Sequence, residues 1–353
     1  MSDLDRETVT AVAQPVEQLR GAAQTQQMQV PSATGGDTAA PRVQPGASGT
    51  ADRIRSGDLN FTAPEVELPP QMGTQNFGAP FLNTYLHYND YLKVPYPVRF
   101  EPWRAAGKFF FELPDGGWYS CTAAMIAPSI LVTAGHCVHE GGNGSEGWLT
   151  DGFFVPAYSQ SVANSRYGYC DVEHVRTTEG WFNIGELDEG YDVALVVCGY
   201  RSGTTNRFMG NRVGWFGFCY ENCRQDWWFL TQIGYPGNYY NGQEMTISQH
   251  VSRAAEGWPD FFYGTGMRGG SSGGPHVANI GEISDSSADP GQYPHRNVIF
   301  AVTSWGYGDQ TLKVQGASPL SGMDNENNFR RMYNQTCVWA RQNLRRRACE
   351  RID

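Results

Sequence analysis

The chain lacks several features that would point to particular classes of protein. It has no run of about 18 or more apolar residues, so no segment is expected to span a membrane as a helix. Its 26 Lys and Arg residues are outnumbered by 36 Asp and Glu residues, for a formal net charge of −10. Nucleic acids and anionic membranes attract basic proteins, so this balance argues against both as partners.

Residues 1–60 contain no Phe, Tyr or Trp and are rich in Gln, Ala, Thr, Gly, Ser and Pro. A segment of this composition cannot bury enough apolar surface to offset the entropy lost when it orders. The sequence therefore predicts a disordered tail over 1–60. Residues 61–96 are also proline-rich but carry aromatic side chains, and we expect them to be either a linker or a pro-segment that lies on the folded domain.

From residue 97 the chain consists of short apolar runs between Gly, Asn, Asp and Pro breaks, for example Ile130-Leu-Val-Thr and Asp192-Val-Ala-Leu-Val-Val. Runs of this length that are rich in β-branched and aromatic residues are typical of strands, so an all-β domain is predicted. Near the end, apolar residues recur at helical spacing and predict a C-terminal amphipathic helix. These residues are Phe329, Met332, Tyr333, Trp339 and Leu344.

No cysteine occurs before Cys121, and all eight lie between Cys121 and Cys349. An even number of cysteines in a Gly-, Trp- and Tyr-rich segment indicates disulfides formed in an oxidising compartment, so we expect an extracellular protein. The first residues, Met1-Ser-Asp-Leu-Asp-Arg-Glu, do not show the basic and apolar regions of a signal peptide. The cysteines and the N-terminus therefore point in different directions on export.

Three motifs supply the residue types of nucleophilic catalysis. They are Leu131-Val-Thr-Ala-Gly-His136-Cys137, Tyr191-Asp192-Val-Ala-Leu and Gly269-Gly-Ser-Ser272-Gly-Gly-Pro275. A serine hydroxyl needs a base to take its proton, and histidine is suited to take and return it at neutral pH. A buried carboxylate fixes the imidazole tautomer and stabilises the imidazolium that forms. His136, Asp192 and Ser272 supply one group of each kind.

A fourth motif, Val302-Thr-Ser304-Trp305-Gly306, follows the other three. With these four motifs in this order, residues 97–335 resemble the chymotrypsin-like serine peptidases, and most of all the bacterial extracellular members. The resemblance implies an all-β fold of two packed antiparallel six-stranded β-barrels with a C-terminal α-helix. On this expectation the peptidase domain covers 97–353, with barrels at about 97–205 and 206–325 and the helix at about 326–346.

The resemblance also implies a serine endopeptidase that works through an acyl-enzyme. The implied catalytic residues are His136 as general acid and base, Asp192 orienting it, and Ser272 as nucleophile. The backbone N–H groups of Gly270 and Ser272 are expected to form the oxyanion hole. The residues expected to contact the substrate are Gly266, Ser304, Trp305 and Gly306.

Disulfide pairing is partly implied by the same resemblance, which joins Cys121 to Cys137 beside the catalytic histidine. Cys170 is expected to pair with Cys198, which ends the strand that begins near Asp192. Cys219 and Cys223 either close a small loop or, as the alternative, bind zinc. Cys337 and Cys349 are left open, because a helix of twelve residues spans ~18 Å and the two can pair only if the helix breaks, for example near Asn343.

Two positions depart from the family pattern. Ser271 stands before the nucleophile where the animal digestive members have an Asp that pairs with a new N-terminus, so any pro-segment within 1–96 is expected to block the cleft or assist folding instead. Gly266 stands where members specific for Lys and Arg have an Asp, and Thr303 where glutamyl-specific members have a His. The glycines predict an open pocket for medium or large apolar side chains, whereas Arg268, if it reached in, would favour acidic ones.

Two further functions stay open at this point: a catalytically silent binding module on the same fold, and an esterase or amidase using the same triad. No cofactor and no metal are expected. His139, three residues after His136, is interpreted as a partly exposed loop histidine rather than a metal ligand. The expected partner is a protein or peptide substrate, and the protein is expected to be a monomer.

Overall fold

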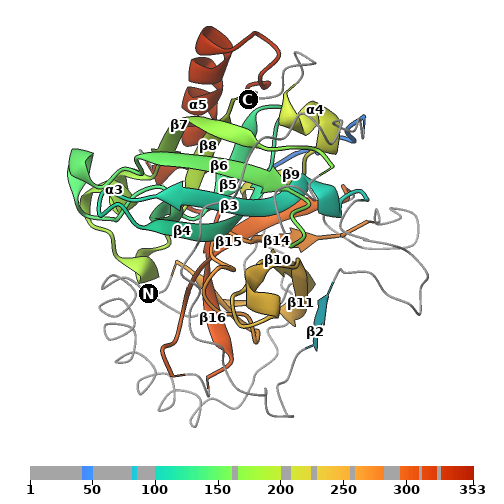
Figure 1. The fold of residues 1–353 in the computed structure, drawn as a ribbon, viewed down its shortest axis with the longest axis vertical. Helices are drawn as coiled ribbons and strands as arrows, with labels where there is room; N and C mark the ends of the chain where they lie inside the picture. Colours follow the sequence, from blue (N-terminus) through green and yellow to red (C-terminus); the bar gives the residue numbers. More distant parts are fainter. Residues whose placement is uncertain are drawn as a thin grey trace, which may run out of the picture.

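Six antiparallel strands close into a barrel in the first half of the computed structural model (Figure 1). The structure describes residues 42–50, 82–85, 100–160, 166–199, 208–223, 229–254, 259–281, 295–309, 312–323 and 327–353. The strand order around the barrel is β3-β4-β5-β8-β7-β6. The strands are β3 (Ala106–Glu112), β4 (Trp118–Met125), β5 (Ile130–Thr133), β6 (Asp151–Pro156), β7 (Cys170–Thr177) and β8 (Ala194–Cys198).

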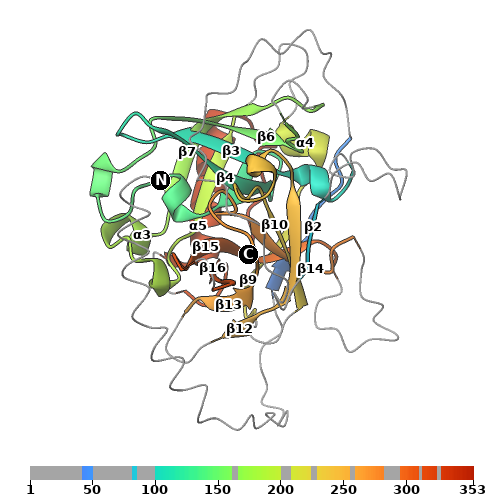
Figure 2. The same ribbon diagram turned by 60° about the horizontal axis from the view of Figure 1, so that its bottom comes forward.

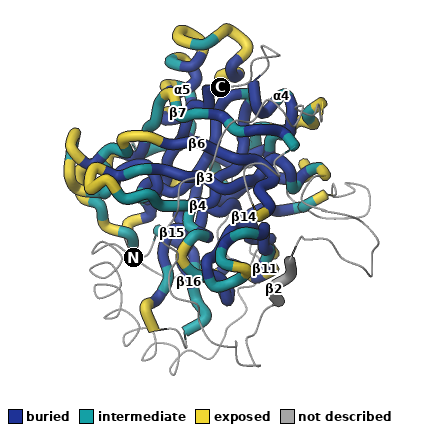
Figure 3. The backbone as a smooth tube through the Cα atoms, viewed as in Figure 1, coloured by how far each residue is buried: buried dark blue, intermediate teal, exposed yellow. Residues whose placement is uncertain are grey.

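The apolar runs of the sequence fill this barrel. Phe109, Phe154 and Leu195 are fully buried, as are all residues of β5 and nearly all of β8. Figure 3 shows β3 and β6 buried along most of their length, whereas β7 is mostly of intermediate burial. The first of the two expected barrels is therefore confirmed.

The second expected barrel is wrong in detail, because its strands form a curled ten-stranded sheet rather than a closed six-stranded barrel. The main path is β12-β13-β16-β15-β14-β10-β11-β2, where β2 is Leu82–Tyr85, and β9 joins it through β15 and pairs in turn with β1 (Arg42–Gln44). The strands are β9 (Gly217–Glu221), β10 (Phe229–Gly234), β11 (Thr246–Val251), β12 (Arg253–Ala254), β13 (Phe261–Gly264), β14 (Pro275–Ala278), β15 (Val298–Gly306) and β16 (Val314–Pro319).

The sheet curls so that one segment of chain, β11 followed by β12, contributes a strand near each of its ends. β11 pairs with β10 and β12 pairs with β13, and only Ser252 separates β11 from β12. Because the chain breaks at Ser252, β11 and β12 are two separate strands. No single strand among the described residues pairs with both β10 and β13, and the sheet curls without closing into a barrel. Figure 2 shows β12 and β13 below the β15–β16 pair.

The N-terminal segment corrects a second expectation. The tail predicted to be disordered over 1–60 includes β1 (Arg42–Gln44), which pairs antiparallel with β9. Beyond it Ala47 exchanges backbone hydrogen bonds with Trp215, at 3.0 and 2.9 Å. Main-chain pairing with an available strand edge holds this stretch, and it needs none of the aromatic side chains that the segment lacks. The rest of the predicted tail lies outside the described residues.

Glycines let this N-terminal strap, residues 42–50, lie directly on the chain that links the two sheets. A Cβ on Gly46 would stand 2.4 Å from the carbonyl oxygen of Trp215, and one on Gly49 would stand 2.2 Å from the nitrogen of Gly214. A second N-terminal strand, β2 (Leu82–Tyr85), pairs with β11. The remainder of 61–96, the predicted linker or pro-segment, lies outside the described residues.

The expected C-terminal helix is confirmed as α5 (Phe329–Asn343), with the side chain of Asn328 capping its first turn. Its buried residues, among them Phe329, Met332 and Tyr333, follow the helical spacing of an amphipathic face. Two short helices, α3 (Glu179–Asn183) and α4 (Met209–Val213), lie in connections. No helix among the described residues is both long and apolar enough to cross a membrane.

Short 3-10 turns complete the connections. They are η2 (Trp103–Ala105), η3 (Gly135–Cys137), η4 (Gly144–Glu146), η6 (Leu187–Glu189) and η7 (Tyr240–Gly242). Of these, η3 matters most for function because it carries His136.

All eight cysteines are paired, so none is available to bind zinc as a thiolate. The bonds Cys121–Cys137, Cys170–Cys198 and Cys219–Cys223 confirm the expected pairs. The open case is settled by a fourth bond, Cys337–Cys349, whose Cα atoms are 5.7 Å apart. The helix ends at Asn343, between the two, which is the break that such a bond requires.

The strap provides a test of stability. Gly46→Ala places a methyl group against the Trp215 carbonyl, and we expect overpacking to lower the free energy of unfolding by roughly 1–3 kcal/mol. Ser48→Ala, which removes only an exposed hydrogen bond to Glu101, is the matched control, expected to change it by no more than about 0.5 kcal/mol. Urea denaturation measures both, and equal stabilities for the two variants would contradict the close packing of the strap.

Candidate active site

The three predicted catalytic residues lie at the ends of strands. His136 is in η3, immediately after β5, and Asp192 lies two residues before β8, the strand that pairs with β5. Ser272 lies in the turn that leads into β14 of the second sheet. The closed barrel thus supplies the imidazole and the carboxylate, and the second sheet supplies the hydroxyl.

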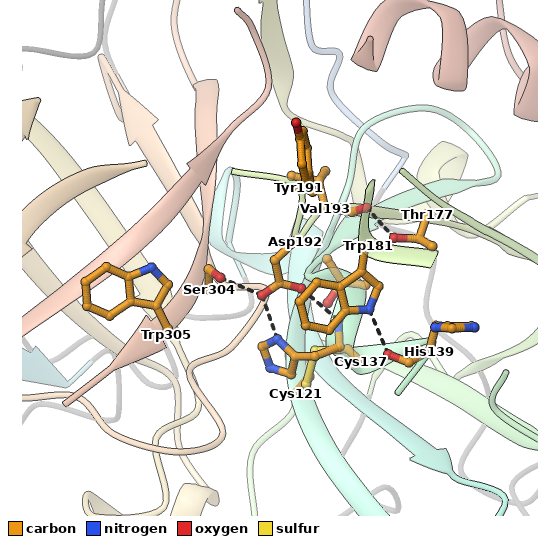
Figure 4. Close-up of polar contacts among 12 residues, drawn as sticks. Cys121, Cys137, His139, Thr177, Trp181, Tyr191, Asp192, Val193, Ser304 and Trp305 are labelled. Carbon is orange, nitrogen blue, oxygen red and sulfur yellow. Dashed lines mark hydrogen bonds and ion pairs between the residues drawn. A yellow bond between two sulfur atoms is a disulfide. The ribbon is translucent and has the colours of Figure 1, made fainter. Parts of the chain in front are cut away.

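Asp192 accepts three hydrogen bonds and its side chain is fully buried. Its Oδ1 accepts from the backbone N–H of His136 at 2.7 Å, and its Oδ2 accepts from the Nδ1 of His136 at 2.7 Å. The hydroxyl of Ser304 in β15 donates to the same Oδ2 at 2.6 Å. In Figure 4, Ser304 approaches Asp192 from one side and Trp181 lies on the other. The carboxylate is therefore held by groups from both halves of the molecule.

This arrangement assigns the tautomer of His136. A carboxylate accepts, so the proton of this bond lies on Nδ1 of His136, and in the neutral imidazole the lone pair is then on Nε2. The His136 side chain is 29% exposed, so this nitrogen belongs to a group that solvent or a substrate can reach.

Close packing around Gly135 places the histidine against the carboxylate. A Cβ on Gly135 would stand 2.8 Å from Cγ of Trp181 and 2.9 Å from Oδ1 of Asp192. The Trp181 indole is fixed in turn, since its Nε1 donates to the carbonyl of His139 at 2.8 Å (Figure 4). A larger residue at 135 would push His136 away from Asp192.

The loop that carries Ser272 is bonded to both halves of the molecule. The carbonyl of Ser272 accepts from the N–H of Thr122 in β4 at 2.8 Å, and the N–H of Gly273 donates to the carbonyl of Thr303 in β15 at 2.8 Å. Thr122 follows Cys121, whose disulfide partner Cys137 follows His136. The backbone of Ser272 is thereby tied to the same strands that hold His136.

Two glycines on this loop have positive φ. Gly273 has φ +74°, and a Cβ there would stand 2.0 Å from the hydroxyl of Thr133. Gly270 has φ +93°, and a Cβ there would stand 2.5 Å from the carbonyl of Tyr235. Within the described part of the chain, the N–H groups of Gly270 and Ser272 donate to no protein acceptor. Both are therefore available to an oxyanion.

Ser271, which replaces an acidic residue of the resembled family, is satisfied inside the loop. It is 1% exposed, and its hydroxyl donates to the carbonyl of Arg268 at 2.8 Å. The turn thus takes its shape from bonds within 268–271, and this side chain needs no charged partner.

The residues predicted to contact substrate lie on the segments on either side of this turn. β14 pairs with β15 only as far as Val302, so Ser304–Gly306 continues beyond that pairing. Trp305 turns its indole inward, where its Nε1 donates to Asp260 at 2.7 Å. Gly266 lies on the chain that enters the turn, and its carbonyl accepts from Asn238 at 2.9 Å.

The same arrangement of strands occurs in solved proteases. A protease of Arthrobacter nicotinovorans aligns with a TM-score of 0.53 at 24% identity, over 66% of this chain and 94% of that one. A thermostable serine protease, AL20, from an extremophilic microorganism gives 0.51 at 24% identity, over 65% and 97%. A Glu endopeptidase gives 0.50 at 19% identity, over 72% and 95%.

The chain has the chymotrypsin-like serine protease fold.

Curated relatives agree with this fold at low identity. The glutamyl endopeptidase of Bacillus licheniformis is 26% identical over 204 residues, which are 55% of this chain and 56% of that protein. A protein of Bacillus subtilis named extracellular metalloprotease is 25% identical over 188 residues, which are 53% and 55%. The chain therefore spans about half the length of the curated relatives it matches. No protein-family model matches it.

A buried polar network lies behind the Ser304–Gly306 segment of this chymotrypsin-like protease fold. The hydroxyl of Thr303 contacts Nε2 of His276 at 3.0 Å, and Nδ1 of His276 contacts Nε2 of His250 at 2.9 Å. Gln232 donates to Thr303 at 2.9 Å, and the hydroxyl of Tyr263 lies 3.2 Å from it. All five side chains are buried.

Burial keeps this network neutral. Desolvation lowers the pKa of His250 to about 3, and desolvation together with the nearby His250 lowers the pKa of His276 well below its ordinary value. The position that holds histidine in glutamyl-specific proteases thus has a threonine backed by two uncharged imidazoles. The network therefore places no positive charge beside the segment predicted to bind substrate.

His139 corrects a smaller expectation, because it is fully buried rather than partly exposed. Its Nδ1 accepts from the N–H of Gly141 at 2.9 Å and its Nε2 contacts the carbonyl of Gly144 at 2.6 Å. Both nitrogens are occupied by the loop that His139 shapes, which leaves neither for a metal. Its spacing from His136 gave no sign of this burial.

Arg268 was expected to favour acidic substrate side chains if it reached into the pocket. Its guanidinium donates to the carbonyls of Tyr307 at 2.9 Å and Leu312 at 3.1 Å. The side chain therefore joins the turn of the nucleophile to the loop beyond β15. These two bonds direct the guanidinium toward the loop beyond β15 rather than toward an acidic substrate side chain.

Sequence reasoning missed two contributions to the site. Ser304 was predicted only as a substrate contact, yet its hydroxyl donates to Asp192. Trp181 was not singled out, although it packs beside the His136 ring with centroids 6.2 Å apart. The Ser-Trp-Gly motif could have indicated the role of Ser304. Nothing in the sequence of Glu179–Asn183 indicates the contact that Trp181 makes with His136.

The two buried histidines of the polar network, His250 and His276, make the stability of the protein depend on pH. The unfolded chain binds protons on both below about pH 6.5, whereas the folded protein keeps them neutral, so the free energy of unfolding falls as pH drops from about 6.5 toward 3. Each group contributes up to about 1.4 kcal/mol per pH unit. We expect His250→Leu, which cannot titrate, to reduce this slope.

The measurement is urea unfolding at several pH values between 5 and 7.5. Nδ1 of His250 has no hydrogen-bond partner among the described residues, so the replacement gives up one contact, that of Nε2 with Nδ1 of His276, and the quantity compared is the slope rather than the absolute stability. His295→Gln, at an exposed site, is the matched control and should keep the wild-type slope. A His250→Leu slope equal to that of wild type would show that His250 is not held neutral.

Proposed function

We propose that this protein is a serine endopeptidase that hydrolyses peptide bonds through an acyl-enzyme on Ser272. His136 acts as general acid and base, and Asp192 orients it. The observation that carries the proposal is the set of three hydrogen bonds that the buried Asp192 carboxylate accepts, two from His136 and one from Ser304. The distant similarity to serine endopeptidases supports it.

The chemistry follows from these groups. The Oγ of Ser272 attacks the substrate carbonyl carbon while Nε2 of His136 takes its proton. The carbonyl oxygen becomes negative and accepts from the N–H groups of Gly270 and Ser272. The C–N bond then breaks as His136 returns the proton to the leaving amine. Water repeats the sequence on the acyl group, and Ser272 regains its hydrogen.

Asp192 contributes without changing its own protonation. When His136 takes a proton, the carboxylate stabilises the imidazolium through the bond to Nδ1. The hydroxyl of Ser304 shares the same oxygen and keeps the carboxylate facing the ring. The backbone of Ser304–Gly306 is assigned to pair with an extended substrate as an added strand.

The relative named as a metalloprotease prompts a test of whether a metal fits this site. Among the described residues, the one cluster with three possible ligand atoms is Cys121, His136 and Cys137. The two sulfurs are joined to each other in a disulfide, so neither is a thiolate that a metal could bind. The residues do not fit a metal, and no step is assigned to one.

The proposal includes an extracellular location and a monomeric enzyme. Four disulfides are typical of proteins that fold in an oxidising compartment. Every residue given a catalytic role comes from this one chain, so the site needs no second copy. Its partner is the protein or peptide that it cleaves.

A fluorophosphonate probe tests the nucleophile. We expect one probe per molecule on the wild-type protein, found by peptide mass mapping on Ser272, and none on Ser272→Ala. Ser318→Ala, at a buried serine of β16 whose Oγ has no hydrogen-bond partner among the described residues, is the matched control and should still be labelled. Absence of label on folded wild-type protein would favour a catalytically silent binding module, and ester hydrolysis without casein hydrolysis would favour an esterase.

Ser304 provides a second test of the proposed mechanism. Ser304→Ala removes one of the three donors to a buried charge, a bond worth about 1.5–3 kcal/mol. We expect kcat/KM to fall by about tenfold or more, since ~1.4 kcal/mol corresponds to a factor of ten. Steady-state kinetics on a peptide amide measure this, and an unchanged kcat/KM would mean that the bond does not support catalysis.

A further inference from the structure

The strand opposite the proposed substrate segment carries a long polar side chain where the sequence predicted open space. Gln315 in β16 is the antiparallel partner of Gly306 in β15. Directly opposed residues in a sheet point to the same face, and Gly306 has no side chain of its own on that face. Gln315 therefore extends over the site that a side chain at 306 would occupy.

Distances show how closely it does so. A Cβ on Gly306 would stand 3.2 Å from Cγ, 3.4 Å from Nε2 and 3.8 Å from Cδ of Gln315. The nearest atoms over Gly306 thus belong to this one side chain. Gln315 is 5% exposed, so other groups surround it.

The far end of Gln315 reaches the turn of the nucleophile. Its Nε2 donates to the carbonyl of Met267 at 3.0 Å and lies 3.4 Å from the hydroxyl of Ser271. Met267 follows Gly266, and Ser271 precedes Ser272. The carboxamide therefore spans the space between the two segments assigned to substrate binding, Gly266–Ser272 and Ser304–Gly306.

The other end of the carboxamide is equally fixed. Its Oε1 accepts from Nε2 of Gln232 at 3.0 Å and from the hydroxyl of Tyr263 at 3.0 Å. Gln232 is itself held, since its Oε1 accepts from the hydroxyl of Thr265 at 2.8 Å. Displacing Gln315 would break the two buried hydrogen bonds that Gln232 and Tyr263 donate to its Oε1, which is costly. A substrate side chain cannot easily push it aside.

We propose that Gln315 sets the specificity of this enzyme by closing the pocket for the residue on the acyl side of the scissile bond, so that small uncharged side chains such as Ala, Ser and Gly are preferred. This inference rests on the proposed function. It replaces the sequence expectation of an open pocket for medium or large apolar side chains. Charged side chains are disfavoured as well, because the network beside Gln315 holds no charge to pair with them.

The test is the cleavage profile of a peptide library, together with kcat/KM on four matched peptide p-nitroanilides that end in Ala, Phe, Glu or Lys. Wild type should cleave after Ala at least about tenfold more efficiently than after the other three. Gln315→Gly should raise the Phe-to-Ala ratio of kcat/KM by about tenfold or more, because it vacates the space over Gly306.

Two further variants distinguish an effect of side-chain volume at position 315 from a general effect on folding. Gln315→Met keeps the volume without the amide and should retain the preference for Ala. Gln243→Ala changes a half-buried glutamine whose bond is to Tyr158, outside this network, and should keep the wild-type profile. Fluorophosphonate labelling of Ser272 on each variant verifies that the site is folded, so the ratio is read only on competent enzyme.

The outcomes are distinct. A labelled wild-type enzyme that prefers Phe, Glu or Lys would overturn the role of Gln315 while leaving the serine endopeptidase proposal intact, and so would an unchanged ratio in labelled Gln315→Gly. If Gln315→Gly does not fold, the wild-type profile and Gln315→Met still test the proposal. A Met variant that cleaves after Phe as well as after Ala would contradict closure of the pocket by the bulk of the side chain at 315. Absence of both label and cleavage in wild type would instead refute the proposed function.

Discussion

The buried carboxylate of Asp192 is the constraint on which the rest of the structure depends. A charge without solvent exposure is tolerated only when hydrogen bonds replace its water, and its partners must come from wherever the chain can supply them. One half of the molecule provides two donors on His136 and the other provides the hydroxyl of Ser304. The carboxylate therefore fixes the position of β15 relative to β5, and a shift of either segment would leave the charge short of a donor.

The strands and the order of the motifs could be read from the sequence because their signals are local, and the closed barrel was implied by the family resemblance that those motifs carry. The run that ends at His136 and the run that follows Asp192 are both strands and carry their chemistry at their ends. The pairing of Cys337 with Cys349 could be stated only as a condition, that the helix break between them, and α5 meets that condition by ending at Asn343.

What could not be predicted depends on contacts between distant segments. The composition of residues 42–50 argues against order, and their pairing with β9 becomes visible only once the fold places an unoccupied strand edge beside them. Gln315 belongs to a run without a recognisable motif, and its position over Gly306 follows from strand register. The second sheet was expected to close as the first does, but a break at Ser252 divides the strand that would have completed it.

The strap also has a consequence for the order of events in folding. Arg42 pairs with Glu221, so β1 leaves the ribosome long before the strand that receives it. Contacts between residues so far apart in sequence form late, because the intervening chain must order before they repay the entropy of closing the loop. During synthesis β1 is therefore already present when β9 emerges. The docking of β1 on β9, across the linker between the two sheets, belongs among the last steps of folding.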